Sequence, residues 1–197
     1  MNRGNYFDEI AYIEADVSAG TLRTRGGTRV VALTSEFLHA MSSSLATECG
    51  PAAGRVLKAA GRAWGKRFAA QIEGVLGDYE AMPLREVSFG EFAGRLAAAF
   101  SHHGFGILTL DTAHTGIGVL TATITGSPEP PELLAGFVAG VLSHFSGEDL
   151  DAMPTQLTPM LKLAVTLPSR LDRVADAVHR GLSHEEVLAA LTESRAE

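Results

Sequence analysis

Two predicted helices carry glycines in their interiors, and this feature constrains the fold more than any other. The glycines are Gly54, Gly61 and Gly65 in a helix expected over residues 51–76, and Gly136 and Gly140 in a helix expected over 132–145. Residues four or seven positions apart lie near one face of a helix, and an interior glycine costs about 1 kcal/mol relative to alanine. We therefore expect another backbone to approach these faces, and we treat the five glycines as a candidate interface with a sheet or another subunit.

The remaining elements indicate an α+β fold with a small antiparallel sheet covered on one face by helices. Strands are expected at 28–33, 105–110, 118–125 and 161–167, further helices at 35–48, 88–103 and 183–194, and an irregular stretch between Pro154 and Pro159. A hairpin-length connection joins the second and third strands, which predicts antiparallel pairing. Two capping boxes mark helix starts, Ser88 with Glu91 and Ser183 with Glu186.

The chain is expected to divide into three parts. Residues 1–24 are acidic and aromatic and are interpreted as an N-terminal docking segment. Residues 25–170 hold the α+β domain, and residues 171–197 form a C-terminal helical extension. The last helix places Val187, Leu188 and Leu191 on one apolar stripe, and a helix of ~12 residues needs a surface to bury such a stripe.

Charge and cysteine content exclude several classes of function. The chain has 16 Lys and Arg against 23 Asp and Glu, a formal net charge of −7, which argues against broad nucleic-acid binding. No apolar run reaches the ~18–20 residues that a membrane span needs. A lone cysteine, Cys49, excludes an intramolecular disulfide and a zinc site built on several thiolates. We predict a cytoplasmic protein.

No group of residues forms a catalytic signature. The two commonest nucleotide-binding motifs, GxGxxG after a strand and GxxxxGK[ST], are missing from the sequence. The adjacent His102 and His103 do not share a helical face, and we interpret them as C-terminal capping residues. Glu148, Asp149 and Asp151 lack the spacing of an EF-hand loop and are expected in a solvated loop. We predict no enzymatic activity, no cofactor and no metal, although a histidine-and-carboxylate site assembled across the fold stays open.

Large apolar side chains supply the candidate ligand pocket. They are Phe37, Met41, Leu57, Trp64, Phe68, Phe100 and Phe105. Helical spacing could bring them together between the long helices and the sheet. Pocket and plain core use the same residue types, and tryptophan is highly buried on average. Trp64 is therefore either a core ring or the wall of a small-molecule site.

Several local strings resemble the 4-vinyl-reductase-like, or hydrocarbon-binding, domain family, which shares its fold with Bet3-like trafficking proteins. The strings are TRVVALT at 28–34, GRAWG at 61–65, HGFG at 103–106 and LLAGFVAG at 133–140. The resemblance implies a module that senses or binds an aromatic, hydrocarbon or tetrapyrrole-like ligand. Many members bind zinc through cysteines near the last strand. Residues 151–165 contain no cysteine here, so that metal site cannot be carried over.

A second resemblance is to the cellulose synthase D family, whose members are oligomeric scaffolds without catalytic residues. It rests on Phe37-Leu38, Gly61-Arg62, Phe105-Gly106 and EDLDAMPTQ at 148–156. Proteins of both families tend to self-associate, and symmetric dimers are the commonest soluble oligomers. We therefore predict a homodimer or larger homo-oligomer, with the glycine-bearing helices or the terminal segments in the interface. The predicted function is non-catalytic ligand binding, with an oligomeric scaffold as the alternative.

Overall fold

The computed structural model describes residues 13–24, 27, 29–31, 33–80, 86–127 and 130–193. Its main helices are α1 (Ser35–Cys49), α2 (Ala53–Glu80), α3 (Phe89–His102), α4 (Pro131–Ser146), α5 (Pro168–His179) and α6 (His184–Glu193). Its strands are β1 (Ile13–Asp16), β2 (Thr21–Thr24), β3 (Arg29–Val30), β4 (Ile107–Asp111), β5 (Val119–Thr125), β6 (Asp151–Gln156) and β7 (Leu161–Thr166). No described helix is long and apolar enough to cross a membrane.

The central sheet has four strands in the order β4-β5-β7-β6, and every neighbouring pair is antiparallel. The predicted α+β class is confirmed. The irregular stretch expected after Pro154 is in part wrong, because residues up to Gln156 belong to β6. The strand accommodates its proline because β6 lies at the sheet edge and its register shifts between Pro154 and Gln156.

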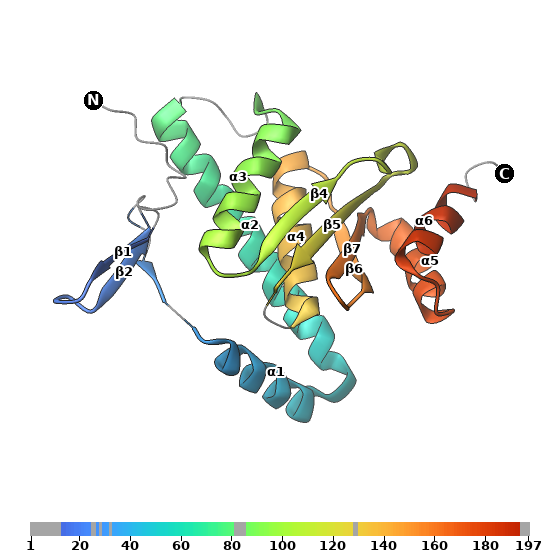
Figure 1. The fold of residues 1–197 in the computed structure, drawn as a ribbon, viewed down its shortest axis with the longest axis horizontal. Coiled ribbons are helices and arrows are strands. Elements are labelled where there is room, and N and C mark those ends of the chain that lie inside the picture. Colours follow the sequence, from blue (N-terminus) through green and yellow to red (C-terminus); the bar gives the residue numbers. More distant parts are fainter. Residues whose placement is uncertain are drawn as a thin grey trace.

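Helices cover both faces of this sheet, where one covered face was expected. Leu161, Leu163 and Val165 of β7 point into the main core with α2, α3 and α4. Ala164, which lies between them in sequence, points into a second apolar cluster with residues of α5 and α6. This alternation follows the two-residue period of a strand. In Figure 1, α2, α3 and α4 lie on one side of the sheet, and α5 and α6 lie beyond β6 and β7.

The interior glycines bring the backbones of α2 and α4 into direct contact. A Cβ atom at Gly61 would overlap the carbonyl oxygen of Leu133, and one at Gly65 would overlap that of Phe137. The glycines of α4 are equally close to α2. A Cβ atom at Gly136 would overlap the carbonyl oxygen of Lys58, and one at Gly140 would overlap that of Arg62. The expected approach of another backbone is confirmed for these four glycines, but its source, a sheet or another subunit, was predicted wrongly. Each glycine-bearing helix packs on the other within one chain.

Gly54 does not belong to this contact. A Cβ atom there would meet only the Cγ of Glu132, at 3.5 Å, which is an ordinary van der Waals distance. The backbone contact therefore begins at Lys58, one turn after Gly54, and runs to the middle of α2.

The described part of the N-terminal segment forms a small sheet of its own. Strands β1, β2 and β3 pair antiparallel in that order, and the strand expected at 28–33 is reduced to Arg29–Val30. Helix α1 follows and has no buried residue. We call β1, β2, β3 and α1 the N-terminal arm; Figure 1 shows it extending away from the central sheet. Residues 1–12 lie outside the described part of the chain.

Both capping boxes begin the helices that they were expected to begin. The Ser183 hydroxyl accepts from the backbone N–H of Glu186, whose carboxylate accepts from the backbone N–H of Ser183 at 2.8 Å. The Ser88 hydroxyl accepts from the N–H of Glu91 in the same way. The Glu91 carboxylate, however, pairs with Arg95 one turn later, so only half of that box is formed.

Replacing Gly61 with alanine should lower the free energy of unfolding by about 1–3 kcal/mol, because the added methyl group must push the α4 backbone away. Gly74 on the same helix is the matched control. A Cβ atom there meets nothing within 4 Å, so Gly74→Ala should stabilise the protein by up to about 1 kcal/mol. Urea denaturation measures both variants. Equal midpoints for the two would contradict the backbone contact.

Candidate functional site

Five aromatic rings gather between α2, α3 and α4, and we call them the aromatic cluster. They are Trp64 and Phe68 on α2, Phe100 on α3, Phe105 just before β4, and Phe137 on α4. The ring centroid of Phe137 lies 4.3 Å from that of Trp64, 5.3 Å from that of Phe68 and 5.7 Å from that of Phe100. Phe137 thus lies at the centre of the cluster, although the sequence prediction did not include it.

The cluster runs from the core to the surface. Phe68, Phe100 and Phe137 are buried, with exposed fractions of 5% or less. Trp64 and Phe105 are half-buried, and their rings meet edge to face at 4.9 Å. The Trp64–Phe105 pair is therefore the part of the cluster that solvent reaches.

The end of α3 holds Phe105 in this position. The N–H of Phe105 donates to the carbonyl of Phe100, and the N–H of Gly104 donates to that of Ser101. These two hydrogen bonds form a Schellman motif, whose left-handed residue is Gly104 with φ of 76°. The motif normally includes an apolar contact across the cap, and here it is the contact of Phe105 with Phe100, at 5.6 Å.

His103 adds a polar ring to the edge of the aromatic cluster. Its ring stacks on that of Phe105 at 6.4 Å and meets Phe68 at 5.3 Å. Its Nδ1 lies 2.7 Å from the carbonyl oxygen of Ala99 and donates to it, which is the predicted capping role. Burial lowers the pKa of His103, and the neighbouring His102 adds to the effect. Both effects favour the neutral ring, and the hydrogen bond to Ala99 acts in the opposite direction.

Three of the predicted pocket residues lie outside the aromatic cluster. Phe37 and Met41 are on α1, and the side chain of Phe37 is 52% exposed. Leu57 is buried near the start of α2, two turns before Trp64. Helical spacing placed these residues correctly within their own helices. It could not show that α1, which a short 3-10 turn at Gly50–Ala52 joins to α2, extends away from the body of the domain (Figure 1).

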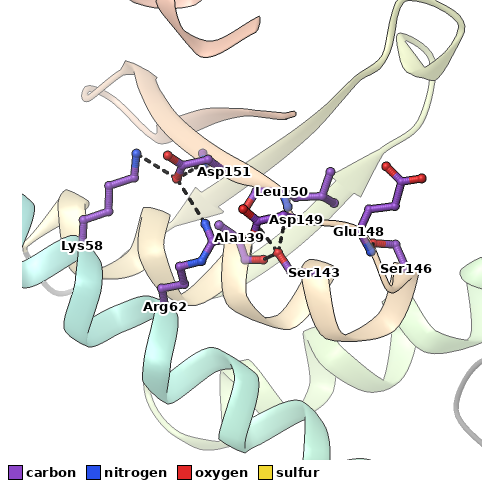
Figure 2. Close-up of polar contacts among 10 residues, drawn as sticks. Lys58, Arg62, Ala139, Ser143, Ser146, Glu148, Asp149, Leu150 and Asp151 are labelled. Atoms are coloured by element: carbon purple, nitrogen blue, oxygen red, sulfur yellow. Dashed lines mark hydrogen bonds and ion pairs between the residues drawn. The ribbon is translucent and has the colours of Figure 1, made fainter. Parts of the chain in front are cut away.

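A polar network ties α2 and α4 to the start of β6 (Figure 2). Lys58 of α2 pairs with Asp151 at 2.9 Å, and Arg62 lies 3.8 Å from the same carboxylate and also pairs with Asp149. The solvated loop that we expected here is wrong for Asp151, which begins β6 and is largely buried, whereas Asp149 does lie exposed in the loop before it. Glu148, the third member, donates its backbone N–H to the Ser146 hydroxyl.

Ser143 completes this junction from inside α4. Its buried hydroxyl donates to the carbonyl of Ala139 at 2.7 Å and accepts from the N–H of Leu150 at 3.0 Å. The turn between α4 and β6 is thus fixed by hydrogen bonds as well as ion pairs. All these groups are paired with one another, so we assign the network a structural role.

A groove of about 650 Å³ lies elsewhere, between α5 and α6. It is lined by Arg173, Asp176, His179, Arg180, Ala190 and Leu191. The groove is open to solvent and includes no residue of the predicted pocket. Within the described residues, no three His, Cys, Asp or Glu side chains come together in a way that could hold a metal ion.

Comparison with known proteins gives a match of fold. No protein-family model and no curated protein matches the sequence. Among solved structures, the chain is similar to the phenol-responsive sensory domain of the transcription activator PoxR, solved with phenol. The TM-score is 0.63 at 14% identity, and the match covers 82% of this chain and 88% of that domain. At this identity the similarity establishes a shared fold.

Proposed function

We propose that this protein is a non-catalytic module that binds, and so senses, small aromatic molecules at the aromatic cluster. The observation that carries the proposal is the fold, since it matches a phenol-responsive sensory domain over most of both chains. The resemblance of local strings to the hydrocarbon-binding family supports the same conclusion independently. The site that we propose is the half-buried edge of the cluster at Trp64 and Phe105.

Aromatic rings bind to such a surface through stacked and edge-to-face contacts, each worth about 0.5–1.5 kcal/mol beyond the area buried. A ligand ring would pack against the half-buried Trp64 and Phe105, whose rings contact one another, while the buried Phe137 supports Trp64 from the core side. Small sites also need a few polar groups to orient the ligand. The ring of His103, stacked on Phe105, is a polar side chain at the edge of this cluster.

Self-association is the second part of the proposal, and it keeps the scaffold function as the alternative. The glycines of α2 and α4 are occupied within the chain, so the terminal segments remain as the interface. The N-terminal arm favours this choice because α1 buries no residue. Five large apolar side chains of the arm are exposed: Ile13, Val17, Val31, Leu33 and Phe37.

Titration with phenol, followed by the fluorescence of Trp64, tests the ligand proposal, because the chain has one tryptophan. We expect a saturable change in emission. Phe105→Ala should weaken binding about two- to tenfold, since it removes one aromatic contact. Phe89→Ala is the matched control: Phe89 is also half-buried but packs in a separate group with Phe92 and Phe145. No change in emission and no thermal shift with phenol, toluene or a tetrapyrrole would exclude the proposal.

Light scattering at tens of micromolar tests self-association. The expected mass is at least twice the 20.7 kDa of one chain. Phe37→Asp places a charge on the apolar side of α1 and should shift the protein toward the monomer. Leu157→Asp is the control, because Leu157 is similarly exposed but lies between β6 and β7. A monomer mass for the unaltered chain would rule out both the oligomer and the scaffold function.

A further inference from the structure

A buried histidine lies under the first turn of the last helix. His184 begins α6 and is 4% exposed, while Glu185 and Glu186 beside it are exposed. Its Nδ1 lies 2.6 Å from the Oγ1 of Thr155, on β6. That hydroxyl also lies 3.2 Å from the carbonyl oxygen of Lys162. When the hydroxyl donates to the carbonyl, Nδ1–H of the ring donates to Thr155, and this pair of hydrogen bonds fixes the buried ring against β6.

The surroundings of His184 disfavour a positive charge on the ring. Burial lowers its pKa most, and the ammonium group of Lys162 on β7 and the ring of His114 in the β4–β5 connection lower it further. The ring also sits at the positive end of the α6 dipole. Glu185 acts in the opposite direction, but its carboxylate is paired with Lys162 at 2.6 Å.

Helix α6 depends on the sheet for its stability. It has ten residues, and a helix this short is marginal in water. Val187 and Leu188, both buried, pack with Ala164 of β7 and with Val174 and Ala177 of α5. A change that weakens the contact of α6 with the second face of the sheet would therefore release the helix locally.

We propose that His184 is a proton-sensitive latch, which holds α6 on the second face of the central sheet while its ring is neutral and releases the helix when the ring takes up a proton. A charged ring at this place would be buried beside Lys162 and His114, whereas released α6 exposes it to water. Release would also expose Val187 and Leu188 as a new apolar surface. This proposal does not depend on ligand binding at the aromatic cluster.

The sign of the pH effect follows from the direction of the shift. The pKa of His184 is lowered in the docked state from an ordinary value of 6.5. The released state therefore binds more protons, and docking weakens as the pH falls below about 6.5. The loss can reach tenfold in the docking equilibrium per pH unit, the limit for one proton. Below the lowered pKa of the docked state, a further fall in pH no longer weakens docking through this ring. Above pH 6.5, the ring is neutral in both states and docking does not depend on its titration.

Hydrogen exchange of the α6 amides between pH 8 and pH 5, corrected for the intrinsic exchange rates, tests the latch. We expect protection of α6 to fall with pH below 6.5, while that of α4 changes less. His184→Gln keeps a polar partner for Thr155 but cannot titrate, so its α6 protection should not vary with pH. Leu188→Ala should lower the protection of α6 at every pH, but protection should still depend on pH as steeply as in the unaltered protein. A slope unchanged in His184→Gln would overturn the proposal.

A second measurement does not depend on how well the variants fold. The ring protons of His184 report its pKa directly in an NMR titration of the unaltered chain. The latch requires a value below 6.5, with the α6 amide signals changing over the same pH range. A value at or above 6.5, or α6 signals that do not follow the ring, would refute it. The signal that disappears in His184→Gln identifies the ring of His184, and His179→Gln, at an exposed position of α5, is the matched control that should leave this signal and its titration unchanged.

Discussion

The rest of the structure depends on the direct contact between the backbones of α2 and α4. Four glycines, Gly61, Gly65, Gly136 and Gly140, leave no room for a side chain between the two helices. Each glycine costs the helix about 1 kcal/mol relative to alanine. The close approach of the helices offsets this cost because it buries α4 almost completely, from Leu134 to Ser143. With α4 held between α2 and the sheet, the main core has a rigid centre on which α3 and the strands pack.

The candidate site is a direct consequence of this contact. Phe137 lies between Gly136 and Gly140, and Trp64 precedes Gly65, so the two rings meet where the helices are closest. The polar network of Lys58, Arg62 and Asp151 fixes the same pair of helices at the start of β6. The aromatic cluster is thus built on rigid elements, and its exposed edge comes from Phe105, which the cap of α3 holds against Trp64.

Local signals in the sequence predicted most of the helices and strands, because periodicity, capping residues and glycines act over a few residues. They also predicted four members of the aromatic cluster, Trp64, Phe68, Phe100 and Phe105. Phe137 was missed because it lies among small residues, in a helix that is buried on every side and has no distinct apolar face. Contacts between distant segments determine the rest: that α1 extends away from the domain, that Asp151 pairs with α2, and that His184 is buried. A single sequence does not encode such contacts in any local pattern.

The most direct test of the central claim is a ¹H–¹⁵N NMR spectrum of the protein recorded with increasing phenol. If the aromatic cluster binds the ligand, the largest shifts will be at the indole N–H of Trp64 and at the amides of Phe105 and Phe137. Residues lining the groove between α5 and α6, such as Arg180 and Leu191, will change little. Shifts confined to that groove, or no saturable shifts at all, would contradict the account.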